Sequence, residues 1–316
     1  MPQGSPIVCV AGPTASGKTK LGVLLAQHYG GEIVSADSMQ IYRGMVIGTA
    51  APTPEEMEGI PHHMIGIADP REAWSAGRYA RAAIPVVEDI LSRGKLPIVV
   101  GGTGLWMEAL VRGRTFAPGQ AGGAVREALE RELQEGGMEP LLAELRRVDP
   151  ASAEKLHPSD EKRILRALEV FRETGETITA HDARTRLRPP KYQAYTIGLT
   201  FRDRADLYER IDCRVDTMVA QGLLQEVEAL LKSGLPETAT ALQAIGYKQF
   251  LSVYRGDTPA RDAVAEVKLR SRQFAKRQLT WLRRKEDIHW ILWEKTPDFP
   301  AGLQNATEYL LAQGLG

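Results

Sequence analysis

Gly12-Pro13-Thr14-Ala15-Ser16-Gly17-Lys18-Thr19 is the stretch that decides how this chain folds at its start. It matches G-x-x-x-x-G-K-[ST], a loop whose backbone N–H groups surround a phosphate while the lysine adds positive charge. An apolar run at 7–11 precedes it, and a helical pattern over 20–29 follows it. Because strand, loop and helix in that order are the context the motif needs, we expect residues 12–19 to bind a diphosphate or polyphosphate. The Thr19 hydroxyl is then a candidate ligand for Mg2+.

Further apolar runs place this loop in an α/β fold. They lie at 32–35, 96–100, 195–199 and 288–293, with helical patterns between them. Strands that alternate with helices predict a parallel sheet covered on both faces, with a binding site at the carboxyl ends of the strands. We therefore expect a P-loop NTPase-like parallel sheet core that carries a helical insertion domain and a helical C-terminal region.

The segment 118–190 contains no candidate strand. Its helical patterns lie at 124–133, 141–147 and 159–172, the last of them after the expected N-cap Ser159. We expect 118–190 to form a helical insertion domain. The core domain is then built from 1–117 and 191–316, with basic helices near its end.

Composition excludes several classes of protein. The 316 residues are 43% hydrophobic, but no apolar stretch approaches the ~20 residues that span a bilayer. The first residues lack an export signal, so we expect a cytoplasmic protein without membrane contact. Two cysteines, Cys9 and Cys213, are too few for a cysteine-rich zinc module. The adjacent His62 and His63 are either metal ligands or residues of an ordinary packed loop.

Charge is balanced overall, with 40 basic and 40 acidic residues, but it is segregated locally. Residues 268–285 contain eight basic side chains and no acidic one: Lys268, Arg270, Arg272, Lys276, Arg277, Arg283, Arg284 and Lys285. This pattern indicates either a surface for a polyanion or a solvated helix face.

Asp37 is the candidate for acid–base chemistry because it follows the expected strand at 32–35. A carboxylate beside a phosphate loop can take a proton from a nucleophile, bind Mg2+, or simply cap a turn. Gln40 carries an amide that can bind the edge of a nucleobase. The third strand ends in Gly101-Gly102-Thr103-Gly104, without the carboxylate that holds Mg2+ in P-loop ATPases, which argues against a motor or switch ATPase.

Arg210 and Arg214 lie four residues apart, on one face of a helix expected to begin near Asp206. Either could bind a diphosphate, since arginine binds phosphate oxygens in pairs. Ion pairs with nearby acidic residues of the same helix are the alternative.

Together these segments resemble the tRNA dimethylallyltransferases, the bacterial tRNA isopentenyltransferase (IPP transferase) family. The resemblance runs in order over nearly the whole chain. Besides the phosphate loop it rests on Ser35-Ala36-Asp37-Ser38-Met39-Gln40-Ile41-Tyr42-Arg43, Gly101-Gly102-Thr103-Gly104-Leu105, Pro61-His62-His63, Arg163 to Phe171, Gly246-Tyr247 and Ala275-Lys276-Arg277-Gln278-Leu279-Thr280-Trp281-Leu282. The chain departs from the family at Trp106, where tyrosine is usual, and at Cys213-Arg214-Val215-Asp216, which replaces an Arg-Phe-Asp pattern.

The resemblance implies transfer of a dimethylallyl group from dimethylallyl diphosphate to N6 of adenosine 37 in tRNA, by a monomer that uses Mg2+. The loop would bind the diphosphate without hydrolysing ATP, and Asp37 would orient the exocyclic amine and take its proton. The leaving diphosphate would be stabilised by Thr14, Lys18, Thr19 with Mg2+, and Arg214. Contacts with tRNA would come from Asp37, Ser38, Met39, Gln40, Thr103, Arg126, Lys162, Arg163, Ile164, Leu165 and Arg166. The insertion and the basic C-terminal stretch would contact RNA from two sides.

Three other functions stay open on the sequence. An ATP-dependent kinase of a nucleoside or small metabolite would use the same loop, with Asp37 activating a hydroxyl, but it leaves the basic stretch unexplained. A nucleotide-responsive RNA-binding protein explains the basic stretch but gives Asp37 no role. A prenyltransferase that acts on free AMP, ADP or ATP would not need a basic stretch.

Overall fold

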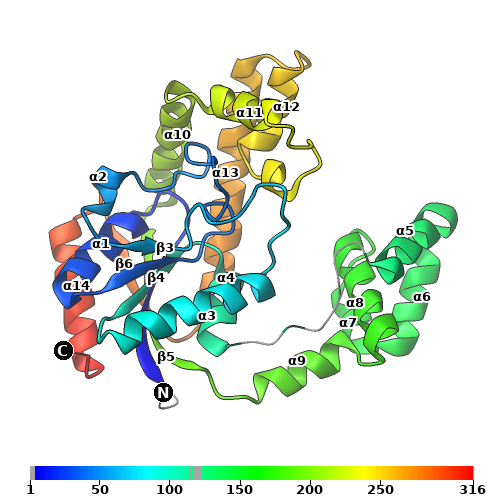
Figure 1. Cartoon of the computed structure of the whole chain (residues 1–316), viewed down its shortest axis with the longest axis horizontal. Coiled ribbons are helices and arrows are strands. Elements are labelled where there is room, and N and C mark those ends of the chain that lie inside the picture. The colour runs from blue at the N-terminus through cyan, green and yellow to red at the C-terminus, as the bar shows by residue number, and fades with distance from the viewer. Residues whose placement is uncertain (1–3, 114–115, 117–122, 316) are drawn as a thin grey trace. The chain divides into compact units, whose positions relative to one another are not determined.

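The chain forms two compact units in the computed structural model, which describes residues 4–113, 116 and 123–315. The core unit comprises Met1–Gly113 with Pro190–Gly316, and the insertion unit comprises Arg114–Pro189 (Figure 1). The first boundary expected from the sequence, at 117–118, lies outside the described residues.

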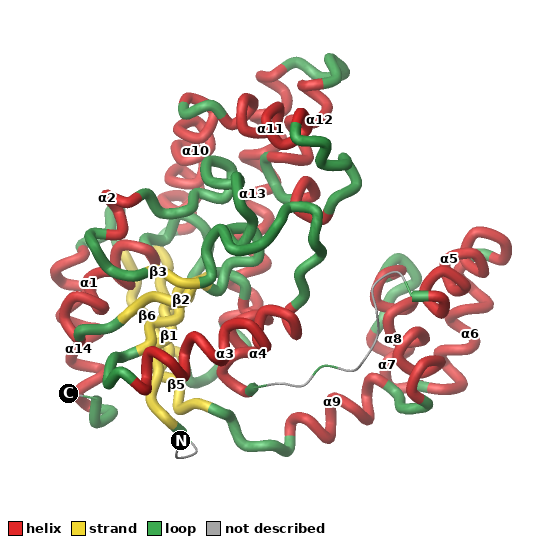
Figure 2. Tube along the Cα trace, viewed as in Figure 1, coloured by secondary structure: helices red, strands yellow, loops and turns green. Residues whose placement is uncertain are grey.

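Within the described residues the core unit is built on a six-stranded sheet in the order β3-β2-β4-β1-β5-β6, with every neighbouring pair parallel (Figure 2). The strands are β1 (Ser5–Ala11), β2 (Glu32–Ser35), β3 (His62–His63), β4 (Pro97–Gly101), β5 (Tyr192–Phe201) and β6 (Ile288–Trp293). This confirms the predicted α/β fold with a parallel sheet. The pair His62–His63 was expected in a loop, and it forms a short edge strand instead.

The order of the strands fixes where a ligand can bind. The chain leaves β1 through helix α1 (Lys18–Tyr29) toward β2, whereas it leaves β4 toward β5 on the other side of β1. Neighbouring strands whose connections leave in opposite directions open a crevice at their carboxyl ends. Because Ala11 pairs with Gly101, the loop after β1 and the turn after β4 lie side by side at this crevice.

Helices cover both faces of the sheet, as its apolar strands require. Helix α1 packs beside α14 (Phe299–Ala312), and α3 (Ala76–Ser92) packs beside α4 (Gly104–Arg112) on the opposite face (Figure 1). Right-handed crossovers place connections that run in opposite directions on opposite faces. Ile7, Val8, Cys9 and Val10 of β1 are consequently all fully buried.

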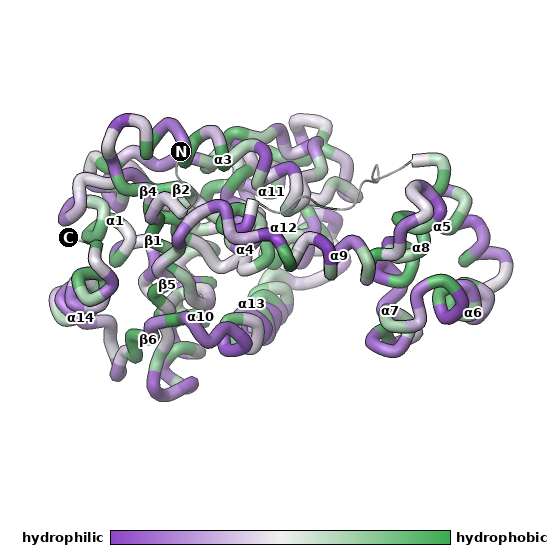
Figure 3. Tube along the Cα trace, turned by 90° about the horizontal axis from the view of Figure 1, so that it is seen from below, coloured by the Kyte–Doolittle hydropathy of each residue, from purple (hydrophilic) through white to green (hydrophobic). Residues whose placement is uncertain are grey.

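A group of helices follows β5 in the core unit, and the first of them packs against β5. They are α10 (Arg204–Ala220), α11 (Leu223–Lys232), α12 (Tyr247–Tyr254) and α13 (Ala260–Leu282), with the 3-10 helix η1 (Thr240–Gln243) between α11 and α12. The short helix α2 (Pro54–Met57) comes earlier in the chain, between β2 and β3. Helices α10 and α12 both pack against α13, and α11 packs against α12. Hydrophilic residues recur along α10 and α13 (Figure 3). Among the described helices, none combines the length and the apolar character that crossing a membrane would require.

The insertion unit has an apolar core of its own, which includes Leu129, Leu141, Leu145 and Leu168. Its helices are α5 (Ala124–Gly136), α6 (Met138–Val148), α7 (Pro150–Lys155), α8 (Glu161–Thr174) and α9 (Ile178–Arg186). No strand occurs in the described part of this unit.

The expected N-cap of α8 is wrong by one residue. Asp160 occupies the N-cap position, and the helix starts at Glu161. The hydroxyl of Ser159 instead lies 2.8 Å from Nδ1 of His157, so it takes part in the turn before the helix and does not cap the helix.

Candidate functional site

The phosphate loop lies between β1 and α1 at the predicted crevice. A side chain at Gly12 would place its Cβ 2.5 Å from the carbonyl oxygen of Leu199, so only glycine fits there. Ala15 and Gly17 have φ angles of 63° and 86°, in the left-handed region. Gly17 caps α1 without a side-chain hydrogen bond, which leaves the N–H groups of the first helical turn open to an anion.

Lys18 is the cation of the phosphate loop itself. Its Nζ donates a hydrogen bond to the carbonyl oxygen of Pro13 at 2.6 Å. Burial, and then the positive charge of Arg214, lower the pKa of the Lys18 ammonium group to about 7, while the Asp37 carboxylate opposes the shift. A bound polyanion would oppose this shift, because it would add negative charge beside the ammonium group.

Helix α10 brings both candidate arginines to the site. Arg210 donates through Nε to the carbonyl oxygen of Ala15 at 3.2 Å, so it supports the loop backbone directly. Arg214 donates to the carbonyl oxygen of Ala50 at 3.5 Å, and the Asp37 carboxylate is close enough for its charge to act on Arg214. The sequence could not choose between these arginines, and the structure gives each of them a different place.

Asp37 divides its two carboxylate oxygens between a turn and the open site. Oδ1 accepts N–H bonds from Met39 at 2.9 Å and from Gln40 at 3.4 Å. Among the described residues, Oδ2 has no hydrogen-bond partner. The turn-forming role and a chemical role are therefore compatible, since each uses a different oxygen.

Thr103 connects this turn to the end of β4. Its hydroxyl oxygen accepts the N–H of Ser38 at 3.2 Å and lies 3.3 Å from the Ser38 hydroxyl. Its own N–H donates to the carbonyl oxygen of Ala36 at 3.3 Å. The hydroxyl predicted to touch a ligand thus also positions the residues that flank Asp37.

The Gln40 side chain is already bonded within the protein. Its amide nitrogen donates to the carbonyl oxygens of Thr49 at 3.3 Å and Ala50 at 3.1 Å. Its Oε1 accepts a bond from the Ser35 hydroxyl at 3.2 Å. Because an amide oxygen has two lone pairs, Gln40 keeps one acceptor position for a ligand and no donor. It can accept an N–H of adenine, but it cannot also donate to the ring without leaving the loop.

Gln278 on α13 bridges the two sides of the crevice, a contact the sequence did not reveal. Its Oε1 accepts the N–H of Thr14 at 3.0 Å, and its Nε2 donates to the carbonyl oxygen of Gly102 at 2.9 Å. A Cβ at Gly102 would lie 2.2 Å from that nitrogen, so glycine is needed for the bridge. Gln278 is only 8% exposed. A polar residue on the side of a basic helix that faces the core was the feature of the sequence that could have indicated this contact.

Trp106, the departure from the family pattern, is a core residue. It is 5% exposed and stacks on Tyr79 with 4.5 Å between the ring centroids. The Tyr79 hydroxyl donates to the carbonyl oxygen of Ser35, two residues before Asp37, at 2.9 Å. The larger aromatic ring is therefore accommodated behind the site.

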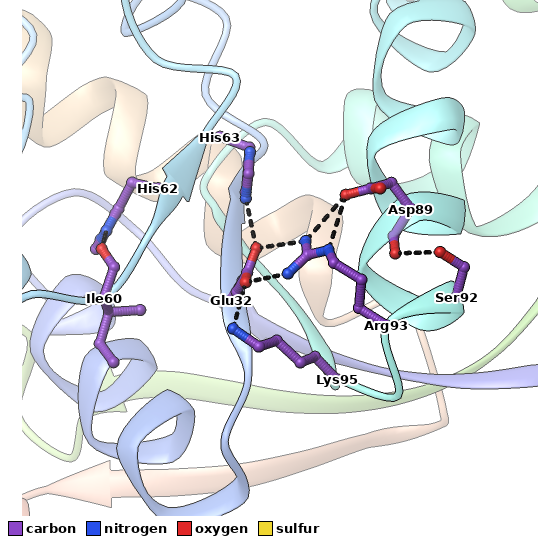
Figure 4. Close-up of polar contacts among 8 residues, drawn as sticks. All are labelled: Glu32, Ile60, His62, His63, Asp89, Ser92, Arg93 and Lys95. Atoms are coloured by element: carbon purple, nitrogen blue, oxygen red, sulfur yellow. Dashed lines mark hydrogen bonds and ion pairs between the residues drawn. The ribbon is translucent and has the colours of Figure 1, made fainter.

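The adjacent histidines are part of a polar network at the opposite, amino end of β2 (Figure 4). His63 lies 2.8 Å from the carboxylate of Glu32, which also pairs with Arg93 and Lys95. His62 contacts the carbonyl oxygen of Ile60 at 2.8 Å. In the described part of the chain, no group of three or more His, Cys, Asp or Glu side chains is arranged to hold a metal ion.

Helix α8 presents only some of its predicted RNA contacts. Lys162 and Arg163 are exposed. Ile164 and Leu165 are fully buried in the core of the insertion unit, so their side chains are packing residues and cannot contact RNA. Consecutive residues of a helix point in different directions, so two of these four side chains face solvent and two face the core of the unit.

Two further predicted contacts in the insertion unit are ion-paired. Arg166 donates to the buried carboxylate of Glu169 at 3.0 Å. Arg126 donates to Glu130 at 2.7 Å along helix α5. Both arginines also position acidic neighbours, and an RNA phosphate would have to compete with those carboxylates.

The basic stretch of α13 and its end separates into two groups. Lys268, Arg270, Arg272 and Lys285 pair with acidic side chains of Asp216, Glu266, Asp212 and Glu108. Lys276, Arg277, Arg283 and Arg284 are exposed and form no ion pair with any described residue. Four unpaired cations near one helix end are typical of a surface that binds a polyanion.

Known families match this chain from near its start to near its end. The model described as "IPP transferase" matches residues 40–285, and that described as "Isopentenyl transferase" matches residues 6–67. A tRNA dimethylallyltransferase of Acetivibrio thermocellus is 42% identical over 309 residues, which is 98% of each chain. One from Symbiobacterium thermophilum is 48% identical over 286 residues, 90% of this chain and 89% of the relative.

Solved structures agree with these sequence matches. The tRNA isopentenylpyrophosphate transferase of Bacillus halodurans superposes with a TM-score of 0.73 at 38% identity, over 98% of this chain and 96% of that one. A eukaryotic dimethylallyltransferase, described as acting on tRNA, superposes with a TM-score of 0.81 at 30% identity, over 98% of this chain and 78% of that one.

Proposed function

Because the chain belongs to the tRNA dimethylallyltransferase family, we propose that it transfers a dimethylallyl group from dimethylallyl diphosphate to N6 of adenosine 37 in tRNA. The observation that carries the proposal is the free Oδ2 of Asp37 at the same crevice as an uncapped phosphate loop. A phosphate loop alone suits many reactions. A carboxylate oxygen open beside it suits the removal of a proton from a nucleophile.

The chemistry follows from the two groups that react. The N6 lone pair of adenine forms a bond to C1 of the dimethylallyl group while the bond from C1 to the diphosphate oxygen breaks. The amine loses a proton, which Oδ2 of Asp37 accepts. Oε1 of Gln40 can orient the amine by accepting its second N–H, because one lone pair of that oxygen is unused.

The leaving diphosphate gains negative charge as the bond breaks. The open N–H groups at the start of α1, together with Lys18 and Arg214, supply donors and positive charge where that charge develops. Lys18 would exchange its bond to Pro13 for one to the ligand.

Mg2+ is the metal that we propose for this site. Thr19 lies in the first turn of α1 with its side chain partly exposed, and a hydroxyl is the kind of hard oxygen ligand that Mg2+ takes. Since no described cluster of acidic side chains could hold the ion alone, Thr19 would share it with water and diphosphate oxygens. Bound there, Mg2+ would neutralise part of the diphosphate charge.

The tRNA would be held by exposed cations of both units, of which Arg163 also pairs with Asp160 at 3.7 Å. These exposed residues lie on α13 or directly after its end in the core unit, and on α8 in the insertion unit: Lys276, Arg277, Arg283, Arg284, Lys162 and Arg163. The acceptor base must leave its stack to reach a buried crevice. We further propose that the protein works as a monomer in the cytoplasm, where tRNA is processed.

Asp37→Asn tests this function and the role of the carboxylate together. Asparagine keeps an oxygen that can accept the N–H groups of Met39 and Gln40, but it cannot take the proton. We expect transfer of labelled dimethylallyl groups to tRNA to slow by ~10²-fold or more, with unchanged tRNA affinity. Asp69→Asn is the matched control, since Asp69 forms the same kind of turn bond, to Arg71, at an exposed position. Equal rates in both variants would remove Asp37 from the mechanism.

A further inference from the structure

The loop 43–51, here called the site loop, supports two of the proposed reaction groups through its backbone. The carbonyl oxygens of Thr49 and Ala50 hold the Gln40 amide at 3.3 and 3.1 Å. The Ala50 carbonyl oxygen also accepts a bond from Arg214 at 3.5 Å. Any shift of the site loop would therefore move both side chains relative to the substrates.

One carboxylate from a distant helix holds the site loop. Oε2 of Glu226, on α11, accepts the N–H groups of Val46 and Ile47, each at 2.8 Å. Its Oε1 accepts the N–H of Gly48 at 3.0 Å and the hydroxyl of Tyr247 at 2.6 Å. A carboxylate has about four lone-pair positions, so these four bonds saturate Glu226.

Packing shows that the helices, rather than the sheet, set the position of the site loop. A Cβ at Gly48 would lie 2.5 Å from the ring of Tyr247 and 2.8 Å from Leu223, so the loop backbone rests directly on α11 and α12. Tyr247 and Leu223 are fully buried. Burial, together with the charge and hydrogen bond of Glu226, raises the pKa of Tyr247, which keeps its hydroxyl a donor.

We propose that Glu226 is a positioning residue for the transfer reaction. Its four hydrogen bonds go to the site loop and to Tyr247, so it acts through the groups that it holds. By fixing Val46, Ile47 and Gly48 it places the carbonyl oxygens that hold Gln40 and Arg214, and so aligns the acceptor amine with the diphosphate. The inference rests on the proposed function, because it takes from it the roles of those two side chains.

Glu226→Gln breaks this arrangement with a minimal change of shape. A glutamine has one acceptor oxygen, and its NH2 group would face backbone N–H groups, so part of the Val46–Gly48 segment loses its partner. Misplacement of a reacting group by about 1 Å can cost ~10²-fold in rate, so we expect kcat/KM to fall by about tenfold or more. Glu228→Gln, on the same helix, removes only a surface pair with Lys232 and should leave kcat/KM within about twofold.

A background variant separates positioning from a structural role. With Gln40→Ala present, one group that Glu226 aligns is gone, so adding Glu226→Gln should cost at least about threefold less than in the wild type. Independent effects would multiply unchanged. Tyr247→Phe removes one of the four bonds. It provides the same comparison if Glu226→Gln does not fold, with an expected loss of about twofold to tenfold.

The outcomes are distinguishable. If wild-type protein transfers no dimethylallyl group, the proposed function fails. If the wild type is active but Glu226→Gln matches Glu228→Gln, or if its effect is the same with and without Gln40, the positioning role is overturned. The positioning role is likewise overturned if Tyr247→Phe leaves kcat/KM unchanged, or if it lowers kcat/KM by the same factor with and without Gln40→Ala.

Discussion

Replacing Gln278 by methionine should loosen the crevice, because methionine fills similar space but offers neither a strong acceptor nor a donor. The N–H of Thr14 and the carbonyl oxygen of Gly102 would each lose the side chain that bridges them. Since Gln278 is 8% exposed, water can replace these bonds only in part.

The expected loss of stability follows from the two backbone groups, the N–H of Thr14 and the carbonyl oxygen of Gly102, that lose their hydrogen-bond partner. A buried polar group without a partner costs about 1–3 kcal/mol, so two partly buried groups should cost about 2–4 kcal/mol. For the core unit of about 240 residues, 1 kcal/mol shifts Tm by about 2–4 °C, which predicts a loss of roughly 5–15 °C.

Thermal unfolding followed by circular dichroism, without ligand, measures this directly. Gln273→Met is the control on the same helix. Its side chain accepts a surface hydrogen bond from Arg270 at 3.3 Å, so this variant should shift Tm by no more than about 2 °C. A Tm of Gln278→Met within about 2 °C of the control would refute the argument that this side chain joins α13 to the sheet.

Three further predictions concern charge. Binding of dimethylallyl diphosphate should raise the pKa of Lys18, which is about 7 in the free protein, so at pH 8 binding takes up protons. Calorimetry in two buffers of different ionisation enthalpy measures this uptake, and equal binding heats in both buffers would contradict it. Arg214→Met should weaken diphosphate binding by about tenfold or more, measured by titration, and leave tRNA binding unchanged. Arg93 in particular holds the pKa of Glu32 far below its ordinary value of 4.5, so Glu32 stabilises the fold above about pH 4.5 and progressively less as pH falls. Glu32→Gln should cost about 1–2 kcal/mol at neutral pH, because the side chains of Arg93 and Lys95 are 38% and 43% exposed, and it should flatten the loss of stability in acid, as urea unfolding would show.

The sequence predicted the features that are local in the chain. The strand, loop and helix around Lys18 are contiguous, and each later strand is an apolar run bounded by turns, so the parallel sheet and the carboxyl-end position of Asp37 could be inferred. The edge strand His62–His63 could not, because two residues show no periodicity.

Contacts between distant residues decided the rest. Gln278 meets Thr14 across 264 residues, and Glu226 meets Val46 across 180, so no local pattern contains either contact. The helical spacing of apolar residues indicated that Ile164 and Leu165 are buried. The prediction that all of 162–166 contact RNA was wrong for these two side chains because it did not consider each residue separately. Side-chain direction on a helix therefore has to be applied residue by residue.

Identifying the group that the protein transfers, and the atom that receives it, distinguishes a dimethylallyltransferase from a kinase. Purified protein is incubated with Mg2+, labelled dimethylallyl diphosphate and tRNA that lacks the modification, with labelled ATP in a parallel reaction, and the digested nucleosides are separated. We predict label on N6 of adenosine 37 and no consumption of ATP. ATP consumption without labelled tRNA would contradict the account, and would indicate a kinase in which Asp37 activates a hydroxyl.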